Sequence, residues 1–364
     1  MKLKKRVKFM NNFKINRNLI GENCPTYFIA DIAANHDGDL KKAIDLIYAA
    51  KDAGANAAKF QHFNAETIVS NDTFSSFKKK LSHQKKWKQS VFEVYKNASI
   101  DLSWTKILHK ECKKARIDFF TSPYSIELVE HVDPYVPVYK IGSGDITWLE
   151  IIEHISKKNK PVILATGASS LKDVQRALKI IKKNNKQVCL MQCNTNYTGS
   201  NENFNYINLN VLKQYRKKFK NVILGLSDHT PGHSTVLGAI TLGAKIIEKH
   251  FTLSNNSKGP DHKFSLTPKS WREMVDRSRE LEMSLGNENK KIEQNELESS
   301  IVQRRSLHLT KDYRENQRLD INDTICLRPS LPGSIQPYDS SKAKFKKFVR
   351  KKYKGEVILW KDLK

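Results

Sequence analysis

The sequence predicts an α/β protein in which eight strand–helix units are followed by a small, mostly β unit. Between residues 27 and 285, short apolar runs alternate with amphipathic segments whose apolar residues recur every three or four positions. After residue 285 the chain becomes charged and weakly apolar, and short β-like pieces separated by turn residues follow. Eight successive βα units close a parallel barrel, so the first part is predicted to be a TIM (β/α)8 barrel.

The predicted strands end in small, polar or charged residues, and the carboxyl ends of barrel strands are where such folds carry their active sites. In chain order the strands are YFIADIA (27–33), NAAKFQHF (56–63), DFFTSPY (118–124), VPVYKIGS (136–143), PVILATG (161–167), QVCLMQCN (187–194), VILGLSD (222–228) and AKIIEKHF (244–251). The predicted helices include residues 39–54, 103–115, 148–159, 170–184, 208–219 and 233–244.

The segment 64–103 is too long for a simple connection between a strand and a helix. A long loop at a barrel mouth often carries substrate contacts or an accessory helix, but the Ser- and Lys-rich middle of this one also suits a solvated surface arm. The whole chain is expected to divide into a basic N-terminal extension (1–24), the barrel (25–285), a glycine-led charged linker (286–300) and the β unit (301–364).

Composition limits the classes of function. The formal net charge of +26 invites a nucleic-acid or membrane interpretation, but the lysines are spread along the chain and no basic segment is interleaved with aromatic residues. We therefore expect neither a nucleic-acid nor a membrane partner. Five cysteines without a C-x-x-C pair indicate reduced thiols, and no apolar run has the length of a membrane helix, so a cytoplasmic protein is expected.

Two histidines follow neighbouring predicted strands. His229 comes directly after VILGLSD, and His250 lies near the end of AKIIEKHF. In a barrel both would point toward one place at the carboxyl face, where Asp228 and Asp261 could add oxygen ligands for a divalent metal. No short metal motif is present, so each histidine could equally be an ordinary loop residue.

Ten motifs occur in order along the chain: ADIAANHDGDL, DAGANAAKFQHF, FTSPYS, YKIGSGDIT, PVILATGASS, GLSDHT, EKHFTL, GPDHKFSLTP, RRSLHLTKD and LRPSLPGSI. Together they resemble the sialic acid synthase family, whose members condense phosphoenolpyruvate with an N-acylated amino sugar to make nonulosonic acids. The resemblance implies a TIM barrel closed by a small antifreeze-like (SAF) domain, and a carbon–carbon bond-forming transferase.

The resemblance also implies site residues. Lys59 and Lys140 match the cations that bind phosphoenolpyruvate and act in catalysis. The other residues expected to bind phosphoenolpyruvate are Ser122, Ser143, Ser227 and Asn196. His229 and His250 match metal ligands of a Mn²⁺ or Mg²⁺ site.

The sugar side of the implied site contains Asp31, Asp261, Tyr197 and Arg328, of which Asp31 and Asp261 are also expected to be catalytic. Arg328 belongs to the small domain, and in this family the matching arginine enters the active site of a partner subunit. The resemblance therefore implies a domain-swapped homodimer.

The chain departs from the family pattern at four places: Asp31 and Asp145 stand where glutamate is usual, Ala165 replaces a serine, and Thr198 replaces a proline. These departures leave the identity of the sugar open. They also leave three alternatives: a related sugar-acid synthase, an aldolase on the same scaffold that would use pyruvate, and a catalytically silent sugar-binding protein.

Overall fold

The computed structural model describes residues 12–364, so the first part of the predicted N-terminal extension lies outside the described residues. The chain divides into two compact units, and the division falls between Gly286 and Asn287. None of the helices within residues 12–364 combines the length and the apolar character needed to cross a lipid bilayer.

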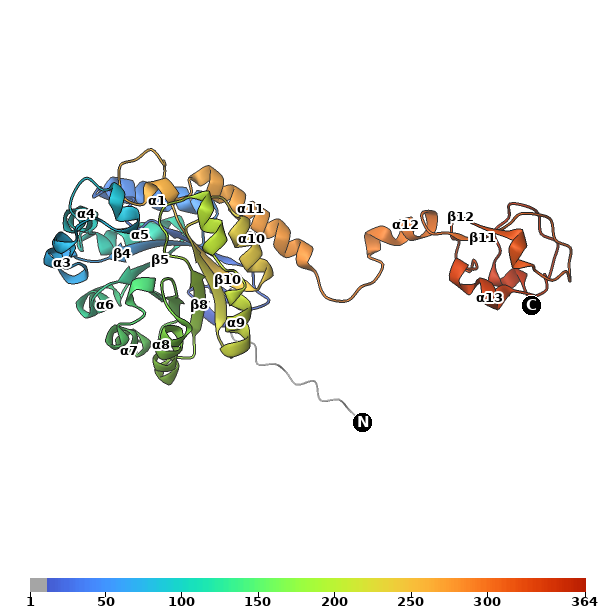
Figure 1. Cartoon of the computed structure of the whole chain (residues 1–364), viewed down its shortest axis with the longest axis horizontal. Coiled ribbons are helices and arrows are strands. Elements are labelled where there is room, and N and C mark those ends of the chain that lie inside the picture. Colours follow the sequence, from blue (N-terminus) through green and yellow to red (C-terminus); the bar gives the residue numbers. More distant parts are fainter. Residues whose placement is uncertain (1–11) are drawn as a thin grey trace. The chain divides into compact units, whose positions relative to one another are not determined.

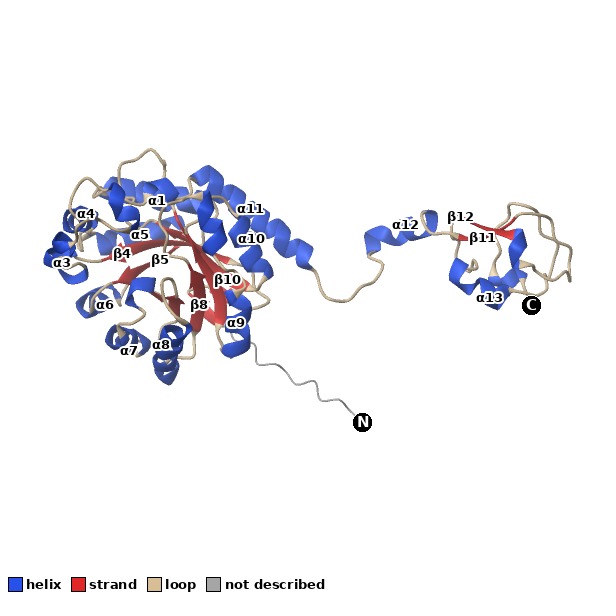
Figure 2. Ribbon diagram, in the orientation of Figure 1, coloured by secondary structure: helices blue, strands red, loops and turns tan. Residues whose placement is uncertain are grey.

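An eight-stranded parallel sheet forms the centre of the first unit, and helices surround it (Figures 1 and 2). Its strands run in the order β5-β4-β3-β10-β9-β8-β7-β6, and the two end strands, β5 and β6, also contact each other. The predicted α/β barrel is therefore confirmed, with all eight strands where the sequence places them. The strands are β3 (Tyr27–Asp31), β4 (Ala57–His62), β5 (Asp118–Pro123), β6 (Tyr139–Ile141), β7 (Val162–Ala165), β8 (Val188–Cys193), β9 (Ile223–Asp228) and β10 (Ala244–His250).

The connecting helices bury the apolar face that the sequence pattern predicts. In α8, for example, Val174, Ala177, Leu178 and Ile181 are buried, and Ser170 begins the helix with a capping box. The barrel helices are α1 (Leu40–Asp52), α5 (Trp104–Ala115), α6 (Ile126–Val132), α7 (Leu149–Ser156), α8 (Leu171–Asn184), α9 (Val211–Lys218), α10 (Ser234–Thr241) and α11 (Pro268–Leu285).

Alternation along the strands decides which polar side chains reach the inside of the barrel. On β10, Glu248 and His250 line the interior cavity, whereas Lys249 between them is buried on the other side against Asp228 of β9. Parallel pairing then sets neighbours side by side, because Asp31 of β3 pairs with Lys59 of β4 and with His250 of β10. The register of three strands thus brings a carboxylate, an ammonium group and an imidazole to one point.

A short hairpin precedes the barrel, within the predicted extension. It consists of β1 (Phe13–Ile15) and β2 (Asn18–Ile20), which pair antiparallel. The side-chain amides of Asn16 and Asn18 each donate to the Asp118 carboxylate at 2.8 Å, and the Tyr27 hydroxyl donates to it at 2.7 Å. Asp118 begins β5, so the hairpin is attached at the amino ends of the strands, away from the site face.

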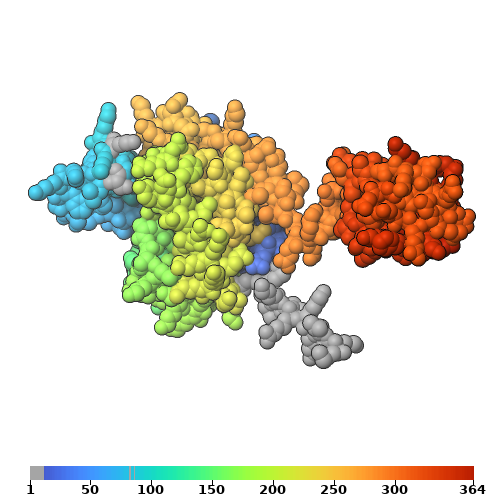
Figure 3. Space-filling model, turned by 45° about the vertical axis from the view of Figure 1, so that its right-hand side comes forward, coloured from blue at the N-terminus to red at the C-terminus, as the bar shows by residue number. Residues whose placement is uncertain are grey.

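The long segment 64–103 contains helices rather than an extended arm. These are α2 (Ala65–Ile68), α3 (Asn71–Ser76), the 3-10 turn η1 (Ser82–Lys86) and α4 (Val91–Ala98). Figure 3 shows this segment, in cyan, projecting from the barrel unit. The structure therefore favours the accessory-helix interpretation over the solvated arm, although the outer surface of the segment remains rich in lysine.

The second unit has a small core of its own, formed by Leu307, Leu309, Tyr313, Leu319, Ile335, Ala343, Phe348, Ile358 and Leu363. The antiparallel strands β11 (Ser306–Leu309) and β12 (Thr324–Leu327) and several isolated bridges surround this core, with the short helices α12 (Leu297–Val302) and α13 (Ser340–Ala343). This agrees with the expected mostly β appendage. Part of the segment predicted as a linker is helical, since α12 begins at Leu297.

Candidate active site

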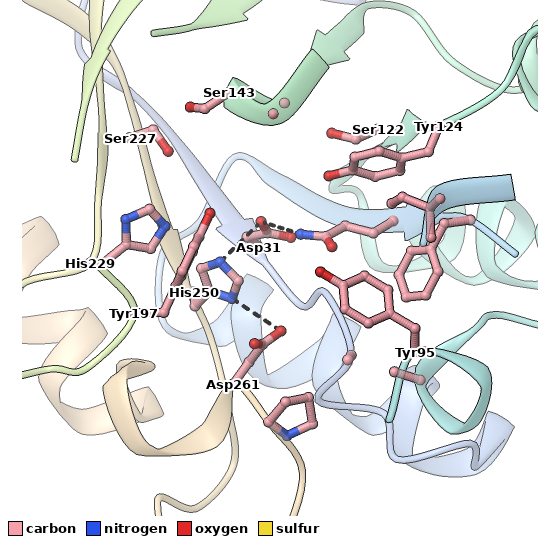
Figure 4. A pocket seen from close by; sticks show the side chains of 18 of the residues that line it. Asp31, Tyr95, Ser122, Tyr124, Ser143, Tyr197, Ser227, His229, His250 and Asp261 are labelled. Atoms are coloured by element: carbon pink, nitrogen blue, oxygen red, sulfur yellow. Dashed lines mark hydrogen bonds and ion pairs between the residues drawn. The ribbon is translucent and has the colours of Figure 1, made fainter. Parts of the chain in front are cut away.

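A cavity of about 360 Å³ opens at the carboxyl ends of the barrel strands. This volume falls within the range of roughly 300–1,000 Å³ typical of small-molecule sites. Ten of the twelve site residues that the family resemblance implies line the cavity, and most of them are labelled in Figure 4. They are Asp31, Lys59, Ser122, Lys140, Ser143, Tyr197, Ser227, His229, His250 and Asp261.

Two buried lysines occupy the floor of the cavity. Lys59 Nζ lies 2.6 Å from Asp31 Oδ2 and 3.8 Å from Glu248 Oε1, and Lys140 Nζ lies 3.2 Å from the same Glu248 oxygen. Burial alone would lower the pKa of Lys59, but the charges of Asp31 and Glu248 outweigh it and raise that pKa. Lys59 is therefore a cation at neutral pH.

Asp31 is the residue at which the sequence departs from the usual glutamate. Its carboxylate accepts hydrogen bonds from Lys59, from Gln61 Nε2 at 3.2 Å and from the Ala33 amide at 3.1 Å. His250 Nε2 lies 3.6 Å from the same carboxylate. The shorter side chain thus accepts from the chain just after β3 and from two side chains of β4, next to the histidine.

Glu248 is a site residue that the sequence analysis did not name. It lies between the two lysines and accepts a hydrogen bond from the Ser227 hydroxyl at 3.3 Å, while its Oε2 is buried and has no partner in the part of the chain that the structure describes. A signal was available, because Glu248 precedes His250 by two positions on a strand and therefore points to the same side of the barrel.

Hydroxyl groups surround the lysine end of the cavity. Ser122 Oγ is buried and has no hydrogen-bond partner among the described residues, whereas Ser143 Oγ accepts from the Gly167 amide at 2.9 Å. The chain next to Ser143 passes close to its surroundings, since a Cβ on Gly142 would lie 3.1 Å from the Tyr124 hydroxyl. Lysines, hydroxyls and exposed backbone together form an environment suited to a phosphate or a carboxylate.

The two histidines meet, as the fold argument predicted. The ring centroids of His229 and His250 are 5.4 Å apart, and the ring of Tyr197 packs 4.4 Å from that of His229. Burial lowers the pKa of His250 well below its usual value, so its ring is neutral.

The residues present fit a divalent metal ion, which the sequence resemblance implies. His229 Nδ1 lies 2.8 Å from the Asn194 carbonyl, which can only accept, so this nitrogen carries a proton and fixes the ring orientation. His250 Nδ1 is buried, makes no hydrogen bond to any described residue and lies 3.7 Å from Asp261 Oδ2. The imidazoles of His229 and His250 would therefore supply the nitrogen ligands of the metal ion. Within residues 12–364 no group of three or more His, Cys, Asp or Glu side chains is arranged to hold a metal, so further positions would be filled by substrate or water.

Two carboxyl groups in the cavity bind protons more tightly than usual. Burial, together with the charge of Asp31, raises the pKa of Asp261 to about 7. Burial raises the pKa of Asp145 to about 6, against the opposing effect of Lys140. Asp145 was noted in the sequence only as a departure from glutamate, and the structure adds it to the lining.

Three predicted residues lie elsewhere. Asp228 does not join the histidines, because its carboxylate is bound by Lys249 and by the hydroxyls of Thr230 and Thr235 on the outer side of the strand. Asn196 is exposed, and its side chain accepts from the Thr198 amide within the loop after β8. Arg328 is exposed in the second unit. The substrate contacts predicted for Asn196 and Arg328 stay predictions.

Comparison with known proteins identifies the family of this site. Residues 46–290 match the model of the NeuB family. The chain belongs to the NeuB family. This confirms the resemblance to sialic acid synthases and the predicted enzyme class, a carbon–carbon bond-forming transferase.

Individual relatives cover most of the chain. An N,N'-diacetyllegionaminic acid synthase of Campylobacter jejuni is 33% identical over 92% of this NeuB-family chain and 98% of its own. A pseudaminic acid synthase of Helicobacter pylori is 32% identical over 84% of this chain and 89% of its own. The crystal structure of an N-acetylneuraminic acid synthetase from Leptospira borgpetersenii, in complex with citrate, matches with a TM-score of 0.70 and 28% identity over 80% of this chain and 95% of that one.

Proposed function

We propose that this protein condenses phosphoenolpyruvate with the aldehyde of an N-acylated amino sugar, giving a nonulosonic acid and inorganic phosphate. Membership of the NeuB family supports the reaction class, and two relatives are named as synthases of diacetyllegionaminic acid and pseudaminic acid. The observation that carries the proposal is one cavity with two buried lysines and three serine hydroxyls at one end and two adjacent histidines beside them.

Lys59 and Lys140 would bind the anionic groups of phosphoenolpyruvate. Both are buried, and a charge-assisted hydrogen bond is stronger where water is excluded. Ser122 supports this position, because its buried hydroxyl lacks a partner within the described residues and a phosphate oxygen would supply one. The substrate would thus be held with its C3 atom facing the histidines.

The acceptor aldehyde would lie between His229, His250 and Asp261. A divalent cation bound there supplies Lewis-acid polarisation of the aldehyde oxygen. The chain orients this end: Tyr197 packs against the His229 ring and limits its rotation, and Asp31 lies within 3.6 Å of His250. Asp261 is placed to accept a hydrogen bond from a sugar hydroxyl.

The reaction forms one carbon–carbon bond and replaces the C2–O bond to phosphate with a C2–O bond to a water oxygen. C3 of phosphoenolpyruvate attacks the aldehyde carbon, the aldehyde oxygen gains a proton, and positive charge develops at C2. Water adds at C2 and loses a proton, and the C2–O bond to phosphate then breaks to leave a 2-keto acid. The buried carboxylates of Asp31 and Glu248 are fixed negative charges near the floor, where positive charge at C2 is stabilised.

A domain-swapped homodimer is part of the proposal. By the sequence resemblance, Arg328 of one chain would contact the N-acyl group of the sugar bound by another. Arg328→Ala should then weaken sugar binding while it spares phosphoenolpyruvate binding. A fully active enzyme that sediments only as a monomer would contradict this part of the proposal.

The deciding experiment measures inorganic phosphate released from phosphoenolpyruvate in the presence of Mn²⁺, with a no-sugar control. The acceptor panel contains N-acetylmannosamine, its 6-deoxy and diamino relatives, mannose and arabinose. Release that requires one N-acylated sugar and stops on addition of a chelator is expected. Carbon–carbon bond formation from pyruvate without phosphate would instead identify an aldolase, and sugar binding without turnover would identify a silent homologue.

A further inference from the structure

A buried ion pair lies directly behind the two histidines, on the outer side of the barrel strands. Its members, Asp228 and Lys249, each immediately precede one of the histidines, and the parallel pairing of β9 with β10 sets them opposite each other. Both side chains are at most 1% exposed. Neither residue is among the described residues that line the cavity, so the pair has no direct contact with a ligand bound there.

The ammonium group of Lys249 binds both residues that flank His229. It forms the ion pair with the Asp228 carboxylate, and it donates to the Thr230 carbonyl at 2.6 Å. Because Lys249 directly precedes His250, one side chain on the strand of one histidine holds the backbone on either side of the other histidine.

The Asp228 carboxylate closes a turn around His229. It accepts from the Thr230 amide at 3.2 Å and from the Thr230 hydroxyl at 2.8 Å. A carboxylate that accepts from the amide two residues later forms an Asx turn, which restricts the backbone of the residue between them. The Thr235 hydroxyl of α10 donates to the same carboxylate at 2.7 Å, so the helix after the turn is attached to it as well.

Backbone pairing alone does not fix the position of His229 relative to β10. The residue pairs between β9 and β10 end at Asp228 and Lys249, so His229 lies beyond the last of them. The hydrogen bond between His229 Nδ1 and the Asn194 carbonyl, at 2.8 Å, orients the ring but comes from the chain after β8. The contacts of the ion pair are therefore the ones that connect the backbone around His229 with β10.

The spacing of the two histidines matters for a metal ion. Two imidazoles bind one cation only when their nitrogen atoms converge, and a binding arrangement has to be held within about 0.5 Å of its productive geometry. The side chains that hold metal ligands in place commonly lie outside the ligand set itself.

We propose that Asp228 and Lys249 are positioning residues of the metal site. Their ion pair fixes the backbone of His229 relative to His250 and thereby brings the two imidazoles into position before the cation binds. The effect passes through the backbone of the two strand ends, because neither charged group faces the cavity. This inference rests on the metal-dependent condensation proposed above.

The test measures the dissociation constant for Mn²⁺ by calorimetric titration of the full chain, and stability by urea unfolding. Removing one member of the pair would leave a buried charge uncompensated, so the variant is Asp228→Asn combined with Lys249→Met. This double variant loses the donor to the Thr230 carbonyl, and its dissociation constant for Mn²⁺ should rise about 10- to 100-fold. Its affinity for phosphoenolpyruvate in the presence of a chelator should equal that of the wild type.

A milder variant keeps the test decisive if the double variant does not fold. Thr235→Val replaces one donor to Asp228 with a methyl group of similar size and leaves no charge unpaired. It should raise the dissociation constant for Mn²⁺ in the same direction by a smaller factor.

Asp118→Ala is the matched control, because it also removes a buried carboxylate that accepts three side-chain hydrogen bonds, but at the amino ends of the strands. It should unfold at a lower urea concentration and bind Mn²⁺ as the wild type does. Wild-type affinity for Mn²⁺ in the folded double variant, or in Thr235→Val where the double variant does not fold, would overturn the inference while the proposed condensation stands. Equal weakening in Asp118→Ala would also overturn it. A wild-type protein that binds no Mn²⁺ and releases phosphate equally well with a chelator would overturn the metal assignment and the inference together.

Discussion

Replacement of Glu248 by glutamine tests whether the buried charges of the cavity floor are balanced before substrate binds. Glu248 Oε1 lies 3.2 Å from Lys140 Nζ and 3.8 Å from Lys59 Nζ, and all three side chains are buried. At an effective dielectric constant of about 20, each attraction is about 4–5 kcal/mol before desolvation is counted. Lys59 keeps Asp31 as a partner, but Lys140 loses its only ion pair within the described residues.

Glu248→Gln should therefore destabilise the ligand-free protein by about 3–5 kcal/mol, the usual cost of leaving one member of a buried ion pair uncompensated. For a unit of this size, that corresponds to a melting temperature lower by about 6–10 °C. Phosphoenolpyruvate would supply a new partner for Lys140, so it should raise the melting temperature of the variant more than that of the wild type.

The assay is thermal unfolding with and without phosphoenolpyruvate. Glu150→Gln is the control, because Glu150 is an exposed glutamate on α7. Suppose that Glu248→Gln melts at the wild-type temperature and gains no extra stabilisation from phosphoenolpyruvate. The charges of the lysines would then not be compensated by Glu248, and the assignment of these lysines as the phosphoenolpyruvate site would be wrong.

Three further predictions concern single side chains. His229→Ala and His250→Ala should each lower metal-dependent phosphate release at least about 100-fold, and near-normal rates in either would contradict the metal assignment. Burial raises the pKa of Asp145 in the folded protein to about 6, so its protonated form stabilises the fold at low pH and this contribution is lost as pH rises through about 6. Relative to the wild type, Asp145→Asn should therefore gain about 1 kcal/mol more unfolding free energy at pH 7.5 than at pH 5, measured by urea unfolding. Asp118→Ala removes the acceptor of three hydrogen bonds and should cost about 2–4 kcal/mol of unfolding free energy without lowering kcat, and an unchanged urea midpoint would contradict the role of the hairpin.

The barrel and most of its floor follow from local patterns in the sequence. Strand periodicity places a residue on the inner or the outer side, and motif order identifies the family, so Lys59, Lys140 and His250 are predictable. The same periodicity also shows why Asp228 was misplaced: it directly precedes His229, and consecutive strand residues point to opposite sides of the sheet. The prediction that Asp228 and His229 both lie beside one metal ion neglected this alternation.

The part of the cavity wall that segment 64–103 forms was not predictable in the same way. The segment 64–103 has short helices and no strand pairing that would set its register, so its position depends on packing between distant residues. Ring contacts such as Phe63 with Tyr95 and His83 with Tyr197 attach the segment to the barrel. No periodic pattern in the sequence predicts such contacts. The sequence left an accessory helix and a solvated arm as equal alternatives, and the structure shows helices that contribute Trp87, Val94 and Tyr95 to the cavity lining. Substrate contacts from this segment stay a prediction.

The charges of the floor predict that phosphoenolpyruvate and the divalent cation assist each other's binding. Lys59 and Lys140 are the only lysines or arginines among the described lining residues, and each is already paired with Asp31 or Glu248. The two lysines therefore offer little net positive charge to a ligand that carries a carboxylate and a phosphate. Each ligand would supply the charge that the other needs, and thermodynamic linkage makes the two effects equal.

Calorimetric titration of phosphoenolpyruvate should accordingly give a dissociation constant about 5- to 100-fold lower with Mn²⁺ than with a chelator at equal ionic strength. Titration of Mn²⁺ should show the same factor when phosphoenolpyruvate is present. His250→Ala should remove the coupling and retain the weaker binding of phosphoenolpyruvate to the lysines. Equal affinity for phosphoenolpyruvate with Mn²⁺ and with chelator would mean that the lysines bind the anion independently of their carboxylate partners, and the charge balance derived from the floor would then be incorrect.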